Sequence, residues 1–117
     1  MSQVDLINQI AGACDDKLAE NIVVLNMEDI SLIADYFLIC HGNSERQVQA
    51  IAHSVKETLE HENITIESME GLQKARWIVI DAGNILCHIF HKDERDHYNL
   101  ERLWGDASRI PLALGQK

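Results

Sequence analysis

The chain has 117 residues, which suits one domain with a single modest core and is too short for two. Apolar residues make up 46% of it, but no run approaches the roughly 18–20 apolar residues of a membrane span and no secretory signal opens it, so we expect a cytoplasmic globular protein. The net charge of −9 disfavours a protein that binds nucleic acid directly through a basic patch.

The first predicted element is an amphipathic helix near the N-terminus. Its apolar stripe recurs at the period of 3.6 residues and consists of Ile7, Ile10, Ala11, Cys14 and Leu18. We expect Asn21 to end this helix in the left-handed conformation. Residues 22–25 form an aliphatic run without alternation, which is typical of a strand covered on both faces.

A second strand and a second helix are predicted in the middle of the chain. The strand covers residues 35–40 and leads into a tight turn at residues 42–44. Ser44 and Gln47 have the spacing of a capping box, so a helix begins there, and it should end at residues 61–63. The stripe of this helix repeats the spacing of the first and consists of Val48, Ile51, Ala52, Val55 and Leu59.

Three more strands are predicted in the second half of the chain. They cover residues 64–67, 75–81 and 85–90. The last two form a hairpin, because Gly83 or Asn84 between them can take a positive φ.

The last predicted helix covers residues 98–104, with Leu100, Leu103 and Trp104 on one face and Gly105 as its stop. We expect residues 1–110 to form the single domain and residues 111–117 to be a frayed tail. The element order predicts an α/β fold with a mixed sheet of about five strands and flanking helices.

The residue pattern gives little support to a catalytic or metal site. The turn at 42–44 joins a strand to a helix, where anions can bind, but it has one glycine, no following lysine, and a serine already used as a cap. Cys40 and His41 point to opposite faces of a strand, and so do His88 and His91. The three cysteines should be reduced and buried. We therefore predict no enzyme, no cofactor and no metal.

Trp77 is the residue that these exclusions leave unexplained. On its strand Trp77, Val79 and Asp81 share one face, while Ile78 and Ile80 lie on the other and suit the core. An outward tryptophan would suit a recognition face, because Trp is enriched among interface hot spots. Packing in the core is the alternative, and the pattern leaves both open.

The segments DYFLIC (35–40), GNSERQVQAIA (42–52), WIVID (77–81), HIF (88–90) and YNLERLWGDA (98–107) occur in an order that resembles the ribosome-silencing factor family, also called the Iojap family. The resemblance covers about residues 4–110. It implies a fold similar to nucleotidyltransferases without their catalytic carboxylates. It also implies binding to the fourteenth protein of the large ribosomal subunit, steric exclusion of the small subunit, repression of translation, and a homodimer when free.

The resemblance also implies the partner-binding residues. Trp77 would be the apolar anchor, and the other candidates are Glu70, Lys74, Asp81, Glu94, Tyr98 and Glu101. Glu101 could instead bond Arg76 or Arg102, and Tyr98 and Trp104 could instead close the core.

The acidic residues are concentrated in the first part of the chain. Residues 1–70 hold 13 Asp and Glu against three Lys and Arg, whereas residues 71–117 hold six against seven. This acidity attracts a basic protein partner or serves solubility alone. The alternative to a translational repressor is a small nucleotide-binding or nucleotidyltransferase-like enzyme that uses the turn at 42–44.

Overall fold

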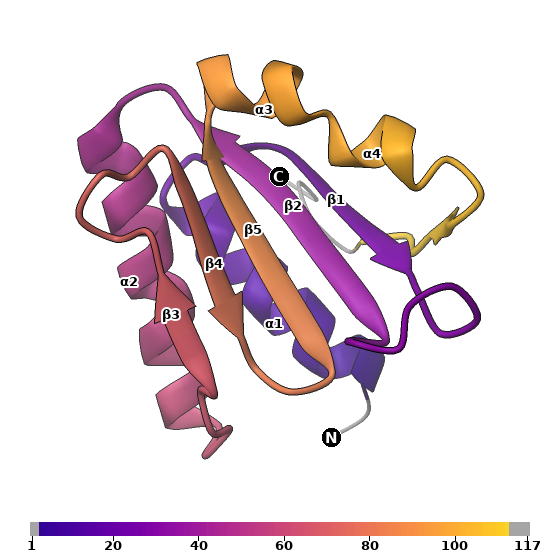
Figure 1. The fold of residues 1–117 in the computed structure, drawn as a ribbon. Coiled ribbons are helices and arrows are strands. Elements are labelled where there is room, and N and C mark those ends of the chain that lie inside the picture. Colours follow the sequence, from indigo (N-terminus) through magenta and orange to yellow (C-terminus); the bar gives the residue numbers. More distant parts are fainter. Residues whose placement is uncertain (1–2, 113–117) are drawn as a thin grey trace.

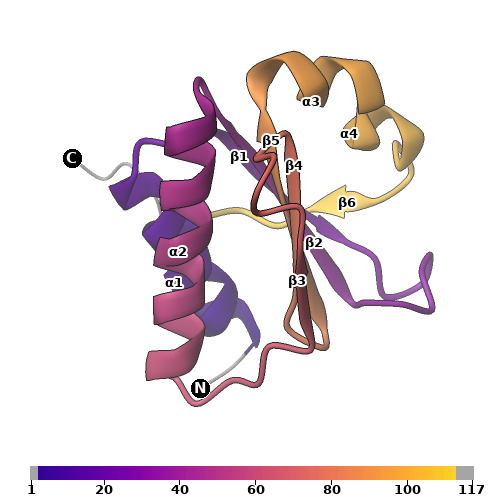
Figure 2. The same ribbon diagram turned by 60° about the vertical axis from the view of Figure 1, so that its left-hand side comes forward.

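The computed structural model describes residues 3–112, in which two helices pack on one face of a sheet and two short helices lie across part of the other (Figures 1 and 2). No helix within this range is long and apolar enough to cross a membrane. The elements in chain order are α1 (Gln3–Asp16), β1 (Glu20–Asn26), β2 (Tyr36–Gly42), α2 (Glu45–His61), β3 (Ser68–Glu70), β4 (Trp77–Asp81), β5 (Ile85–His91), α3 (Lys92–Tyr98), α4 (Leu100–Leu103) and β6 (Ser108–Arg109).

The sheet is mixed, with the strand order β3-β4-β5-β2-β1-β6. Strands β2 and β5 are parallel, and the other neighbouring pairs are antiparallel. This confirms the predicted α/β class and the mixed sheet, but with six strands in place of about five. The strand β6 was missed because two residues carry no periodicity. The likeness to nucleotidyltransferases stays a prediction.

The main core lies between the sheet and the pair α1 and α2. The predicted stripe of α2 is confirmed, because all five of its residues are fully buried. The predicted stripe of α1 is buried from Ile7 to Cys14. The assignment of Leu18 to this stripe is wrong, because 73% of Leu18 is exposed. Leu18 has a φ of 62°, and the backbone bond from Ala19 N to Cys14 O closes a Schellman-type end around it. Leu18 therefore ends the helix, and the left-handed Asn21 lies within β1 at an irregularity.

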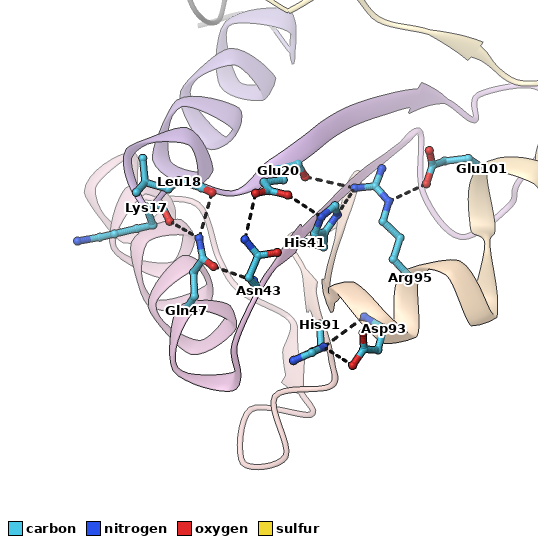
Figure 3. Close-up of polar contacts among 10 residues, drawn as sticks. All are labelled: Lys17, Leu18, Glu20, His41, Asn43, Gln47, His91, Asp93, Arg95 and Glu101. Carbon is cyan, nitrogen blue, oxygen red and sulfur yellow. Dashed lines mark hydrogen bonds and ion pairs between the residues drawn. The ribbon is translucent and has the colours of Figure 1, made fainter.

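The capping box at α2 is half confirmed. Ser44 Oγ accepts the backbone N–H of Gln47 at 3.1 Å, as predicted. The Gln47 amide oxygen instead accepts the N–H of Asn43, and its NH₂ donates to the carbonyls of Lys17 and Leu18 (Figure 3). One glutamine thus joins the start of α2 to the end of α1.

Two predicted elements are wrong in position. Residues 64–67 form no strand, because pairing with β4 begins at Ser68 opposite Asp81, and Ile64 and Ile66 pack singly against the core. The helix predicted at 98–104 is two helices broken at Asn99, which has a φ of 44°. Most of the first of them, α3, precedes the predicted helix.

The chain beyond β6 still contacts the main core within the described range, where Ile110 and Leu112 pack against it. The frayed tail was predicted for residues 111–117, and residues 113–117 lie outside the described part. The domain boundary at residue 110 stays a prediction.

Gly71 is a position where only glycine fits. It has a φ of +86°, and a Cβ there would lie 2.2 Å from the carbonyl oxygen of Trp77. We expect Gly71→Ala to destabilise the protein by about 1–2 kcal/mol for the left-handed backbone and a further 1–3 kcal/mol for the clash, measured by urea unfolding. Gly83→Ala is the matched control, because Gly83 has a φ of +84° with nothing within 4 Å of the added Cβ. Equal losses in the two variants would contradict the clash.

Candidate docking surface

The second face of the sheet carries a cluster of aromatic rings. Trp77 begins β4 opposite Phe90 of β5, and their rings stack with centroids 5.0 Å apart. The ring of Tyr98, the last residue of α3, lies 4.5 Å from that of Trp77. The helices α3 and α4 lie over part of this face (Figure 1). Tyr98 ends α3 and contacts Trp77 and Phe90, and Trp104 ends α4 and packs against the same cluster. The face is therefore an aromatic platform only partly covered by short helices.

The structure shows how Trp77 packs and leaves its recognition role a prediction. Ile78 and Ile80 are fully buried on the helix side, as predicted, and Trp77 and Val79 pack on the other face. Trp77 is half-buried, and its indole Nε1 donates a hydrogen bond to His88 Nδ1 at 3.2 Å. It is thus packed within the aromatic cluster without being fully buried.

Tyr98 and Leu103 complete the exposed part of this region. They are 44% and 67% exposed, and both line an open hollow where α3 meets α4. Leu100, Leu103 and Trp104 were predicted to share one face, but Leu103 is exposed whereas Leu100 and Trp104 pack against the sheet. Trp104 meets Phe37 edge to face, which agrees with core closure. We call Trp77, Tyr98 and Leu103 the docking surface.

Three of the predicted acidic partners already have hydrogen-bond partners within the chain. Glu94 accepts a hydrogen bond from Arg76 Nη2 at 3.0 Å, and Glu101 accepts one from Arg95 Nε at 2.9 Å, so both carboxylates already have partners within the chain. Asp81 ends β4 at the far end from Trp77 and accepts the N–H of Gly83 in the hairpin turn.

Glu70 and Lys74 are exposed and lie at or beyond the end of the edge strand β3. Of the seven predicted residues, the structure brings Trp77 and Tyr98 into ring contact. The contacts of all seven residues with a partner stay a prediction.

Arg95 is a structural residue that the sequence reasoning missed. It lies on α3, is only 6% exposed, and links α3 to three other elements (Figure 3). Its Nε donates to Glu101 of α4, and its Nη1 donates to the backbone carbonyl of Glu20 of β1 at 3.2 Å and to His41 Nδ1 of β2 at 3.0 Å. The sequence does contain a pattern that favours the helix α3, because acidic residues occur in its first turn and basic residues in its last turn.

The hydrogen-bond network around Arg95 extends through His41 and Glu20 to the turn at residues 42–44. His41 Nε2 lies 3.2 Å from Glu20 Oε2, and the Asn43 side-chain amide donates to Glu20 Oε1 at 3.0 Å. The hydrogen bond from Asn43, and then the one from His41, lowers the pKa of the exposed Glu20 carboxyl. Both donors of Asn43, its backbone N–H and its side-chain amide, are therefore engaged within the chain.

The buried cysteines carry no sign of nucleophilic chemistry. Cys14, Cys40 and Cys87 are free and lie in the main core, while His41 lies on the other side of the sheet with Arg95. A hydrogen bond with Cys40, and burial, raise the pKa of the Cys14 thiol, and burial raises that of Cys87. Thiols of this kind are inert. Among residues 3–112 no three His, Cys, Asp or Glu side chains gather to hold a metal ion.

His88 should make stability depend on pH. Burial lowers the pKa of its ring from 6.5 to about 4. Between those pH values the unfolded chain binds more protons than the folded one, so the free energy of unfolding falls as pH drops. We expect a loss of about 3 kcal/mol across this window, measured by urea unfolding at each pH. A His88→Asn variant lacks the imidazole but keeps all the Asp and Glu residues of the chain. The same pH dependence of stability in this variant would contradict the assignment to His88.

Comparison with known proteins gives one consistent result. The family model described as "Ribosomal silencing factor during starvation" matches residues 1–117. Ribosomal silencing factor RsfS of Bacillus subtilis is 54% identical over 115 residues, which cover 98% of each chain. A crystal structure of a Bacillus halodurans protein has a TM-score of 0.82 and 52% identity, and the match covers 92% of this chain and 98% of that one.

A more distant relative is the mouse "Mitochondrial assembly of ribosomal large subunit protein 1", which is 26% identical over 101 residues. That match covers 84% of this chain and 44% of the mouse protein. The full-length family match and the high identity to the Bacillus protein agree with the order of the sequence segments. The chain belongs to the family of ribosomal silencing factors.

Proposed function

We propose that this protein represses translation by binding the large ribosomal subunit on its joining face, through the fourteenth ribosomal protein, and by sterically excluding the small subunit. Family membership supports a role at the ribosome. The name of the mouse relative refers to the large subunit and supports the choice of subunit. The free protein is proposed to be a homodimer, as the family resemblance implies.

The observation that carries this proposal is the docking surface. Trp77 and Tyr98 place two large aromatic rings in contact at 4.5 Å, and Leu103 adds an aliphatic side chain that is two-thirds exposed. Aromatic anchors of this kind supply much of the affinity of protein interfaces. The helices α1 and α2 cover the opposite face of the sheet (Figure 2), so the proposed contact would not involve them.

The charges of the chain support a protein partner over direct RNA contact. The net charge is −9, which repels a phosphate backbone and attracts a basic protein. Glu94 and Glu101 are held by arginines of the chain itself. We therefore assign affinity mainly to the apolar anchors and long-range attraction to the acidic surface.

A subunit-joining experiment tests the proposal. Purified small and large subunits are mixed with increasing amounts of the protein, and joining is followed by sedimentation. The expected result is fewer joined ribosomes, with the protein sedimenting with free large subunits and absent from joined ones. Unchanged joining at saturating protein would reject the proposed function. Pull-down with the isolated fourteenth protein then tests the partner.

The nucleotidyltransferase-like alternative finds no supporting observation. In the turn at 42–44, the N–H of Asn43 is bonded to Gln47, and Ser44 caps α2. A titration with nucleoside triphosphate and magnesium that gives no heat would dispose of it.

A further inference from the structure

Trp77 donates a hydrogen bond to one buried side chain, that of His88. Strands β4 and β5 pair Trp77 with Phe90 and Val79 with His88, so His88 lies diagonally across from Trp77 on the same face. The rings of Trp77 and His88 have centroids 6.0 Å apart, and Trp77 Nε1 lies 3.2 Å from His88 Nδ1. His88 is itself only 6% exposed and meets the ring of Phe37 edge to face at 4.9 Å. Burial and the contact with Phe37 therefore restrict the His88 ring in addition to its bond with Trp77.

The direction of the hydrogen bond from Trp77 determines which nitrogen of the neutral His88 ring carries the proton. An indole N–H can only donate, so Nδ1 must accept and the proton of the neutral ring must lie on Nε2. Nε2 is buried and has no hydrogen-bond partner among the described residues. Burial also lowers the pKa of this ring, which agrees with the neutral form. Nδ1 is thus available to Trp77 throughout the neutral pH range.

We propose that His88 is a positioning residue of the docking surface, which fixes the orientation in which Trp77 is presented to the ribosomal partner. This inference rests on the proposed function. Stacking on Phe90 and contact with Tyr98 restrict the plane of the indole, but stacking is tolerant of rotation within that plane. The hydrogen bond to His88 is directional and selects one orientation. A fixed anchor loses less conformational freedom on binding.

Two variants separate this role from simple packing. His88→Leu keeps an apolar side chain but removes the acceptor, whereas His88→Asn keeps a side-chain oxygen able to accept near the place of Nδ1. The first readout is the indole N–H signal of Trp77 in ¹H–¹⁵N spectra of the free protein, assigned with Trp77→Phe, with the indole of Trp104 as internal reference. The second is affinity for purified large subunits.

In the wild type the Trp77 indole proton should exchange with solvent slowly. We expect exchange to be about tenfold faster in His88→Leu, with affinity for large subunits about fivefold weaker, as loss of one hydrogen bond implies. His88→Asn should recover both values in large part. Fast exchange of the wild-type indole proton would overturn the inference without any variant.

The outcomes distinguish this inference from the proposed function. Altered exchange in His88→Leu with unchanged affinity would overturn the positioning role and leave the proposed function standing. Wild-type protein that does not bind large subunits would reject the proposed function, and the exchange rates would still decide whether His88 holds Trp77.

Discussion

Replacing Arg95 with methionine is expected to lower the free energy of unfolding by about 3 kcal/mol, within the range for breaking a buried ion pair from one side. Methionine has a similar length but no donor. Glu101, with its side chain only 22% exposed, would lose the guanidinium at 2.9 Å, and His41 Nδ1 and the Glu20 carbonyl would each lose a donor. Urea unfolding followed by circular dichroism measures the change.

The matched control is Arg102→Met, on the exposed surface of α4. Surface substitutions of this kind change stability little. A loss of stability for Arg95→Met no greater than that of the control would contradict the assignment.

The structural effect of Arg95→Met should also be local, because Arg95 joins α3 and α4 to strands β1 and β2 (Figure 3). Tyr98 and Leu103 lie on those helices, so the variant should bind large subunits less tightly even where it stays folded.

Replacing Trp77 with alanine is expected to weaken binding to the large subunit by about 30-fold or more, which corresponds to the ~2 kcal/mol of an interface hot spot. The indole supplies the largest ring of the docking surface, and its loss also leaves Tyr98 without a contact at 4.5 Å. Alanine is a sharper test than glutamate, because a charge within this half-buried aromatic cluster would also disturb folding. Co-sedimentation with purified large subunits measures the affinity.

The control for Trp77→Ala is Val4→Ala. Val4 is also partly exposed, at 47%, but it lies on α1 across the sheet from the docking surface (Figure 2). The Val4→Ala variant should bind large subunits with the affinity of the wild type and should block subunit joining equally. Wild-type affinity in Trp77→Ala, with an unchanged fold by circular dichroism, would remove Trp77 from the contact and would leave the subunit-joining experiment to decide the function alone.

Local patterns predicted the elements that make up the main core. The stripe of α2 was predicted correctly because it repeats at a helical period over 12 residues and every member is buried. The alternation along β4 likewise predicted which residues face the helices, since Ile78 and Ile80 are fully buried. Ser44 was identified as the cap because its bond spans only three residues.

The errors fall where a local pattern meets a tertiary constraint. Leu18 continues the apolar period of α1, but the helix ends before it, and Gln47 from α2 bonds the final carbonyls. Asn99 takes the left-handed conformation and divides one predicted helix into α3 and α4. The strand at 68–70 is set by its pairing with β4, which no local preference of residues 64–67 reveals.

By itself the sequence determined the fold class, the acidity, the two long helices with their buried stripes, and the family, because each depends on short-range spacing or on the order of segments. It also singled out Trp77. Only the tertiary structure decided what Trp77 touches, because its ring partners Phe90 and Tyr98 and its acceptor His88 come from β5 and α3. The role of Arg95 was decided in the same way, since its partners lie up to 75 positions away in the chain. Contacts between distant segments depend on strand order and register, and a single sequence does not carry either in its local periodicity.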